Sequence, residues 1–131
     1  WRKYKTRLEP FQVGKHLTPK KISAQDDEVE FRYAWKNGVW HCLEPVSLDL
    51  STADGIREKA HRWLGQVLSV KDSEEKFKVY LLLGEPQSDA LRPAVEKAVR
   101  ILGKLPVDHQ VVREAEADQF AARVAKMVER I

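Results

Sequence analysis

The sequence predicts an α/β fold, in which a β-hairpin over about residues 28–50 opens a mixed β-sheet and helices pack on that sheet. Two observations predict this class. The stretch FRYAWKNGVWHCLEP, residues 31–45, places an Asn-Gly pair between two runs of large alternating side chains, and such a pair is the strongest short-range signal of a hairpin. Helical and strand-like patterns then alternate to the end of the chain, which favours helices on both faces of the sheet. The expected order is β-β-α-β-α-β-α, with an α+β arrangement as the alternative.

A two-residue turn at 37–38 would fix the register of the hairpin, because a shift of one residue moves every side chain to the opposite face. In this register Trp35 lies opposite Trp40, and Glu44 lies on the apolar face. Pro45 has no N–H to give to the partner strand, so we expect the ladder to break or bulge there. The side chains expected on the apolar face are Val29, Phe31, Tyr33, Trp35, Trp40, Cys42 and Glu44.

Three helices and two strands are expected after the hairpin. Ser51 or Thr52 begins the first helix, since a hydroxyl can cap its free N–H groups. The run KFKVYLLLGEP predicts a largely buried strand that ends at Gly84. Ser88 or Asp89 begins the second helix, HQVV is a short strand, and an acidic first turn opens the last helix. The side chains of the last helix expected to point inward are Phe120, Val124, Met127 or Val128, and Ile131.

The N-terminal residues differ in charge from the rest of the chain. Residues 1–21 hold seven basic side chains and one acidic one, which gives them a net charge of +6. The whole chain has a net charge of +3, so the remaining residues have a net charge of −3. We expect residues 1–22 to form a basic arm or linker, with a short helix over Trp1–Leu8 and an extended segment after it. Residues 23–131 would then form a single α/β domain.

Cations interspersed with aromatic side chains are typical of segments that bind single-stranded nucleic acid, through phosphate attraction and base stacking. The basic face of the first long helix would extend this surface. The alternative is a solvated arm whose aromatic side chains attach it to the body or to an upstream domain. The residues assigned to nucleic acid are Arg2, Lys3, Tyr4, Lys5, Arg7, Lys20, Lys21, Arg57 and Arg62.

The remaining features of the sequence indicate the cellular compartment of the protein and its place in a longer chain. Cys42 is the single cysteine, which fits a reducing compartment, so we expect a cytoplasmic protein. Neither a membrane-spanning run nor a signal peptide is recognisable. The four histidines have no zinc-ligand spacing. Because the chain opens on Trp1 rather than Met, we expect it to be the C-terminal part of a larger bacterial protein, with an upstream domain or another protein as partner.

Glu44 carries the only carboxyl on the expected apolar face. Burying a lone carboxylate is costly, so Glu44 needs an ionic partner, a raised pKa or a metal ion. The structural interpretation is a salt bridge, a hydrogen bond to a helix N-terminus, or a place at the margin of the sheet.

The functional interpretation comes from a resemblance. A hairpin with a glutamate on its second strand, followed by a helix and another strand, resembles the core of restriction-endonuclease-like nucleases over roughly residues 27–83. The resemblance implies a divalent metal, Mg²⁺ or Mn²⁺, held by an acid on one strand and a Glu-x-Lys motif on the next. Here that motif reads Glu44-Pro45-Val46, so Val46 stands in the place of the lysine, and Lys59 or Arg57 would supply the cation. The residues that this alternative uses are Glu44, Asp27, Glu30 and Lys59. The stretch from Phe31 to Pro45 is also similar to the C-terminal part of a bacterial family of unknown function.

We therefore expect a non-enzymatic interaction module, without metal or cofactor, whose basic arm contacts nucleic acid or a partner protein. The alternative is a divergent metal-dependent nuclease. The sequence leaves the oligomeric state open.

Overall fold

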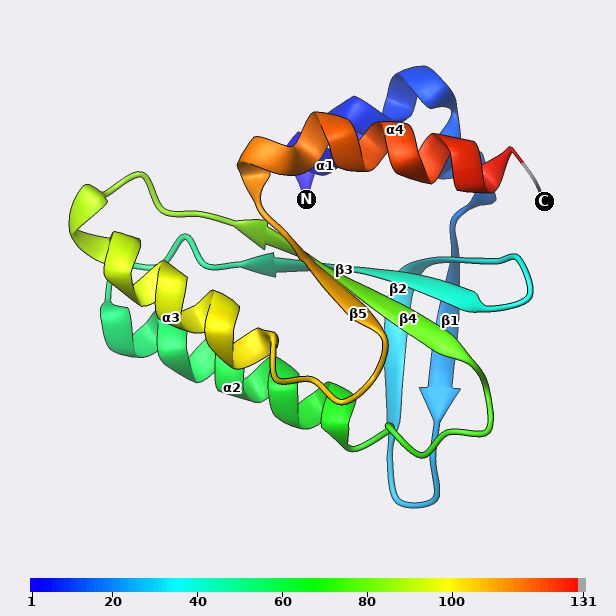
Figure 1. The fold of residues 1–131 in the computed structure, drawn as a ribbon, viewed down its shortest axis with the longest axis horizontal. Helices are drawn as coiled ribbons and strands as arrows, with labels where there is room; N and C mark the ends of the chain where they lie inside the picture. Colours follow the sequence, from blue (N-terminus) through cyan, green and yellow to red (C-terminus); the bar gives the residue numbers. More distant parts are fainter. Residues whose placement is uncertain (130–131) are drawn as a thin grey trace.

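The structure is a computed structural model that describes residues 1–129. Within these residues, one mixed sheet lies between helices on both of its faces (Figure 1). The α/β class is therefore confirmed. The strands are β1 (Thr18–Ser23), β2 (Glu28–Lys36), β3 (Trp40–Ser47), β4 (Phe77–Gly84) and β5 (His109–Val112). The helices are α1 (Arg2–Leu8), α2 (Ala53–Leu68), α3 (Arg92–Leu102) and α4 (Ala117–Val128), with short 3₁₀ turns at η1 (Glu9–Phe11), η2 (Val13–His16), η3 (Asp89–Leu91) and η4 (Glu114–Glu116).

The strands lie in the order in which they occur in the sequence, β1-β2-β3-β4-β5. The pairs β1–β2 and β2–β3 are antiparallel, whereas β3–β4 and β4–β5 are parallel. The two parallel connections run through α2 and α3, which pack on one face, while α1 and α4 pack on the other (Figure 1). As expected, Thr52 caps α2: its hydroxyl accepts a hydrogen bond from the Gly55 N–H at 3.0 Å.

Strand β1 is an addition to the expected order, and the boundary expected at residue 22 falls inside it. Its sequence, Thr-Pro-Lys-Lys-Ile-Ser, does not show the pattern of a typical strand, because it contains a proline and two lysines. These residues are nevertheless typical of a strand at the edge of a sheet. Ile22 is its one buried residue. The helix expected over residues 1–8 is present as α1, but it is packed on the body, with Tyr4 and Leu8 buried.

The expected register of the hairpin is wrong by one residue. Lys36 lies opposite Trp40, and Trp35 lies opposite His41, so the connection has three residues, 37–39. A two-residue turn of the expected kind needs positive φ at both central positions. Only Gly38 meets this condition, with φ of +93°, while Asn37 is not among the residues with positive φ.

A β-bulge also divides the face that we expected to be continuous. Arg32 and Tyr33 of β2 lie opposite Pro19 alone, so the pairing with β1 shifts by one residue. A bulge of this kind reverses which side of the sheet the following residues occupy. Phe31 therefore packs on the α2–α3 side, whereas Tyr33 and Trp35 pack on the α1–α4 side.

The sheet carries one apolar core on each face. The α2–α3 core includes Cys42, which is fully buried, as expected of a structural cysteine. Burial raises the pKa of its thiol to about 12. The α1–α4 core includes the inward positions expected in α4, namely Phe120, Val124 and Val128; Ile131 lies outside the described residues. No described helix is both long and apolar enough to cross a membrane.

Candidate functional site

The sheet opens between β2 and β3. Their ladder runs from the Lys36–Trp40 pair to the Tyr33–Leu43 pair, and β3 then continues in register with β4 alone. Pro45 stands in this unpaired part of β3, where its missing N–H leaves no donor for β2. The break expected at this proline is thus confirmed, and it leaves a space between the diverging strands.

A hollow of about 380 Å³ occupies this space. We call it the Glu44 hollow. Trp63 reaches it from α2 and Trp1 reaches it from the α1 side of the sheet, so the opening is lined from both faces. The residues that line it are Trp1, Glu30, Arg32, Tyr33, Glu44, Pro45 and Trp63.

A second hollow, of about 280 Å³, adjoins the first and lies under α1. We call it the Lys5 hollow, after the basic side chain at its rim. Trp1, Arg32 and Tyr33 line both hollows. The rings of Trp1 and Tyr33 are stacked, with centroids 4.1 Å apart and planes at 12°. The two hollows, separated by this aromatic stack, are called the Trp1 groove below.

Glu44 is the half-buried acid of the groove. Its side chain lies on the same face as Cys42 and Val46, toward α2. Burial raises the pKa of its carboxyl to about 7, although Arg32 and Lys59 act to lower it. Among the contacts of residues 1–129, this carboxyl has neither a hydrogen-bond donor nor an ion-pair partner. It is therefore an unused acceptor inside a hollow.

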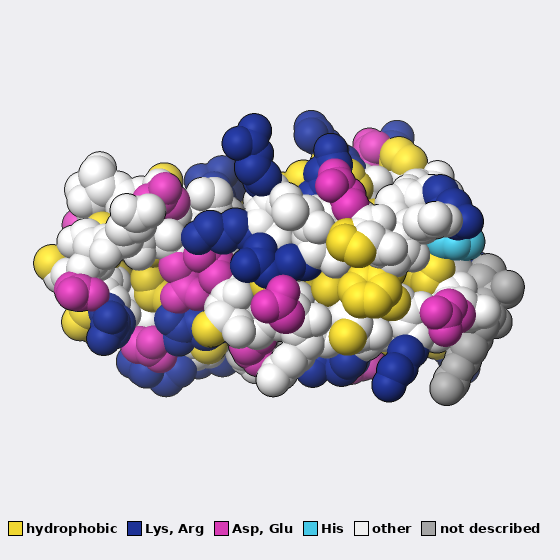
Figure 2. Space-filling view, turned by 90° about the horizontal axis from the view of Figure 1, so that it is seen from above, with side chains coloured by type: hydrophobic (Ala, Val, Ile, Leu, Met, Phe, Trp, Pro, Cys, Tyr) yellow, Lys and Arg dark blue, Asp and Glu magenta, His cyan; other side chains and the backbone are white. Residues whose placement is uncertain are grey.

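Three cations beside the groove, Lys5, Arg32 and Lys59, differ in exposure but have no acidic partner in the described part of the chain. Lys5 and Arg32 are exposed and Lys59 is half-buried, and none of the three forms an ion pair within residues 1–129. Figure 2, which looks onto α1 and α4, shows Lys and Arg side chains gathered along the side of α1, with acidic side chains among them. Lys5 brings this basic side of α1 to the rim of the groove.

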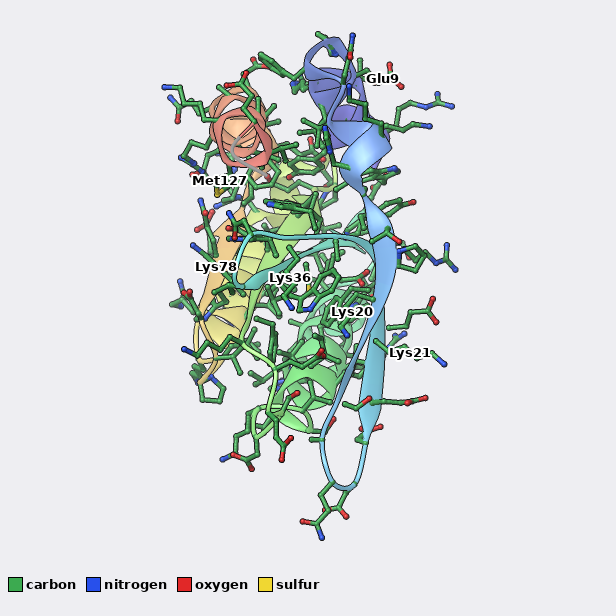
Figure 3. The ribbon with its side chains drawn as sticks, turned by 90° about the vertical axis from the view of Figure 1, so that its right-hand side faces the viewer. Glu9, Lys20, Lys21, Lys36, Lys78 and Met127 are labelled. Atoms are coloured by element: carbon green, nitrogen blue, oxygen red, sulfur yellow. The ribbon has the colours of Figure 1, made fainter. Side chains whose placement is uncertain are left out.

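Most of the other cations that the sequence singled out are paired with acids. Lys3 contacts Glu114 and Arg7 contacts Asp118, on the η4–α4 segment. Lys20 and Lys21 lie on β1 (Figure 3). Lys20 contacts Glu75 at 2.8 Å, and Lys21 lies 3.8 Å from Glu28. Surface pairs of this kind are weak, so they compete poorly with a bound polyanion. Those without an ion pair in the described part of the chain are Arg2, Lys5, Arg57 and Arg62.

Tyr4 does not lie on the surface where we expected it. It is buried, and its hydroxyl donates to the backbone carbonyls of Leu83 and Val112. Burial and the nearby Glu114 raise the pKa of its phenol. Tyr4 therefore holds α1 in place and is not available to stack on a base.

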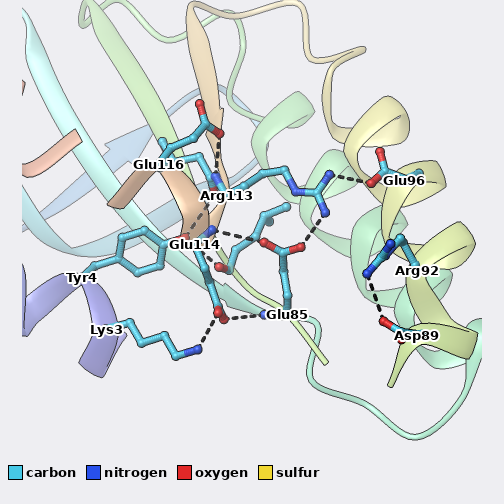
Figure 4. A network of polar contacts seen from close by, with 11 residues as sticks. Lys3, Tyr4, Glu85, Asp89, Arg92, Glu96, Arg113, Glu114 and Glu116 are labelled. Atoms are coloured by element: carbon cyan, nitrogen blue, oxygen red, sulfur yellow. Dashed lines mark hydrogen bonds and ion pairs between the residues drawn. The ribbon is translucent and has the colours of Figure 1, made fainter. Parts of the chain in front are cut away.

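A second charged cluster lies at the carboxyl ends of β4 and β5 (Figure 4). Arg113 donates to Glu85 and to Glu96, and the backbone N–H of Glu114 donates to Glu85. Burial acts to raise the pKa of Glu85, but the hydrogen bonds from Arg113 and Glu114 lower it below its usual value. Crevices at such strand ends often bind ligands. Here the charges satisfy one another, so the cluster ties β4, β5 and α3 together.

The residues of the nuclease alternative come together only in part. Glu30 and Glu44 line the same hollow, and Lys59 is close enough to influence the pKa of Glu44. Asp27 instead accepts a hydrogen bond from the Ser69 hydroxyl at 2.6 Å, in the turn between β1 and β2, and this bond lowers its pKa. Within residues 1–129, no three His, Cys, Asp or Glu side chains are placed to hold a metal ion. Mg²⁺ is usually held by one or two carboxylates together with water and substrate phosphates, so Glu30 and Glu44 would supply only part of its ligands.

Sequence reasoning included Trp1 among the aromatic side chains of the basic arm, but it did not place Tyr33 and Trp63 beside it. The available signal was Pro45, because a proline that breaks a ladder leaves an opening beside it.

The sequence matches no protein-family model, and neither a curated protein nor a solved structure is significantly similar to it.

Proposed function

We propose that this domain is a non-enzymatic module that binds single-stranded nucleic acid in the Trp1 groove. The observation that carries the proposal is the grouping of three aromatic side chains, Trp1, Tyr33 and Trp63, with cations that have no partner in the described chain. Binding of single strands combines a positive rim that follows the phosphates with aromatic rings on which bases stack. The groove supplies the aromatic rings, and Lys5 and Arg32 supply positive charge at its rim, beside the acidic side chains of Glu9 and Glu30.

The form of the groove favours unpaired bases over a duplex. The aromatic stack of Trp1 on Tyr33 separates two hollows, so neighbouring bases would enter one hollow each. Bases of a duplex are stacked and paired, and cannot be turned into such hollows without the cost of unstacking. Arg32, which lines both hollows, would contact the phosphate between the two bases. A single buried thiol suits a reducing compartment, and we place this binding in the cytoplasm.

The proposal is tested by binding of labelled oligothymidylate and oligouridylate, measured by fluorescence anisotropy across a salt series. Affinity should fall as salt rises, with a slope of about 0.7 per phosphate contact. Arg32→Gln should weaken binding and lower this slope by about one contact. Arg100→Gln removes another exposed cation, on α3 and away from the groove, and should leave both quantities unchanged.

Stacking is tested separately by Trp63→Leu, which keeps an apolar side chain at this position of α2. Removing one base–aromatic stack should weaken binding of both oligonucleotides about tenfold. A DNA strand and an RNA strand that differ in affinity would show whether the sugar contributes. If neither oligonucleotide binds, or if binding ignores salt and is equal in Arg32→Gln and Arg100→Gln, the proposal is wrong.

A divergent nuclease is the second candidate, and the placement of Glu30 and Glu44 in one hollow beside Lys59 favours it. Incubation of plasmid DNA with Mg²⁺ or Mn²⁺ separates the two proposals. Cleavage by the wild-type chain that Glu44→Gln abolishes would replace the binding module with the enzyme.

A further inference from the structure

The inference concerns the unused acceptor in the Glu44 hollow, and it rests on the proposed function. The carboxyl of Glu44 meets no donor within the described chain, and its oxygens are open to the hollow and not fully buried. The side chains around this carboxyl indicate what kind of ligand it could bind. Trp63 and Tyr33 line the same hollow. Burial favours the neutral form of the carboxyl, while Arg32 and Lys59 act in the opposite direction and favour its ionised form. The hollow therefore presents an acceptor together with aromatic side chains on which a flat ring can stack.

An ionised carboxylate accepts hydrogen bonds at both oxygens and donates none. Among the bases, only guanine offers two adjacent donors on its Watson–Crick edge, the N1–H and the 2-amino group. Cytosine and adenine place an acceptor nitrogen beside their amino group, and uracil and thymine place carbonyl oxygens on either side of N3–H. Each of these would bring an acceptor against the carboxylate, which is unfavourable.

We propose that the Glu44 hollow receives an unpaired guanine base, whose N1–H and 2-amino group donate to the two carboxylate oxygens of Glu44. The base would lie beside Trp63, and the phosphate that follows it would lie within reach of Arg32. Single-stranded recognition through Watson–Crick edges of unstacked bases is the usual route to sequence preference in such proteins. The domain would then select strands by a guanine rather than bind them uniformly.

The test uses a thymidine oligonucleotide in which one central residue is replaced by guanosine, adenosine, cytidine or inosine. With the wild-type chain, the guanosine strand should bind about tenfold more tightly than the all-thymidine strand, the factor expected for one good bidentate contact. Inosine retains the N1–H but lacks the 2-amino group, so it should fall between the two. Adenosine and cytidine should give no gain.

Glu44→Gln keeps the size of the side chain but offers one acceptor and one donor group in place of two acceptors. It should remove the guanosine preference while the all-thymidine strand binds as before or more tightly. The matched control is Glu58→Gln, an exposed carboxyl on α2 outside both hollows, which should keep the full preference. Unchanged binding of the all-thymidine strand shows that the Glu44 variant is folded.

A pH series gives a second readout. Because the carboxyl of Glu44 ionises near pH 7, the guanosine preference should grow as the pH rises from about 6 to about 8. The charged groups near Glu44 are Glu30 and Arg32 on β2 and Lys59 on α2, and each is retained in the Glu44→Gln variant, which should show no such rise.

The outcomes separate the inference from the function on which it rests. Wild-type binding of the all-thymidine strand without any guanosine preference would overturn the guanine site and leave the binding module standing. A preference that survives in Glu44→Gln would also overturn it. Failure of every strand to bind would overturn the module and the guanine site together.

Discussion

The hydroxyl of Tyr4 donates a hydrogen bond to the backbone carbonyl of Leu83 at 2.7 Å, and it also lies 3.2 Å from the carbonyl of Val112. This contact joins α1 to the ends of β4 and β5, two neighbouring strands that lie far from it in the sequence. Trp1 and Lys5 flank Tyr4 along the same helix, so the attachment of α1 places both of them at the groove. The site thus depends on a residue that cannot itself contact a ligand.

Tyr4→Phe should lower the free energy of unfolding by about 1 to 2 kcal/mol, because it leaves buried carbonyl groups without their donor. Urea denaturation followed by tryptophan fluorescence measures the change. Tyr33→Phe is the matched control, since the half-buried Tyr33 hydroxyl forms no hydrogen bond within residues 1–129, and the Phe ring preserves the stack on Trp1. Equal stabilities of the two variants would mean that the Tyr4 hydroxyl does not secure α1.

Local chemistry in the sequence predicted the elements of the fold but not their exact alignment. The cap at Thr52 and the end of β4 at Gly84 depend on nearby residues, and both were expected. The register of the hairpin depends on the length of the turn, which has two residues if both Asn37 and Gly38 adopt positive φ and three residues here, where only Gly38 does. The Asn-Gly pair alone does not decide between these lengths. The bulge at Arg32 and Tyr33 could not be foreseen without knowing that β1 pairs with β2.

In the candidate site too, the sequence predicted the features that depend on nearby residues but not those that depend on tertiary structure. Glu44 was recognisable because a carboxyl within an apolar alternating pattern is conspicuous, even though the pairing assumed for it was shifted. Trp1, Tyr33 and Trp63 come from three separate elements, and only the tertiary structure brings them together. Charge composition was misleading at the N-terminus, because the exposed lysines and arginines of α1 concealed the buried Tyr4 and Leu8 on its other side.

The turn at Gly38 offers a test of the observed hairpin. Gly38 has φ of +93°, a region that residues with a side chain rarely adopt, so Gly38→Ala should lower the free energy of unfolding by about 1 kcal/mol or more. Gly65 lies within α2 with open space where a methyl group would be added. Gly65→Ala should therefore raise the free energy of unfolding by up to about 1 kcal/mol. Thermal unfolding of both variants measures the difference, and shifts of the same sign would contradict the backbone described for residue 38.

The raised pKa of Glu44 has a consequence for stability as well as for binding. The carboxyl has a pKa of about 7 in the folded chain against an ordinary value of 4.5, so the folded state holds this proton more tightly than the unfolded state. The favourable contribution of the protonated form is therefore complete below about pH 4.5 and is lost as the pH rises toward 7. Above that range, the folded chain bears the cost of a half-buried charge.

The Glu44→Gln variant has no carboxyl at this position, so its free energy of unfolding should lack the pH dependence that Glu44 gives to the wild type. The variant should resemble the wild type near pH 4.5, and at pH 8 its free energy of unfolding should exceed that of the wild type. A shift of the pKa from 4.5 to about 7 corresponds to about 3.5 kcal/mol at about 1.4 kcal/mol per unit. Solvent screens the half-buried carboxyl, so we expect a difference of about 2 to 3 kcal/mol. Denaturation of both proteins at a series of pH values isolates the effect, because every other titrating group is common to the two. A difference for Glu44→Gln that does not change with pH would show that this carboxyl ionises as it does in water, and would remove the half-buried acceptor on which the guanine site depends.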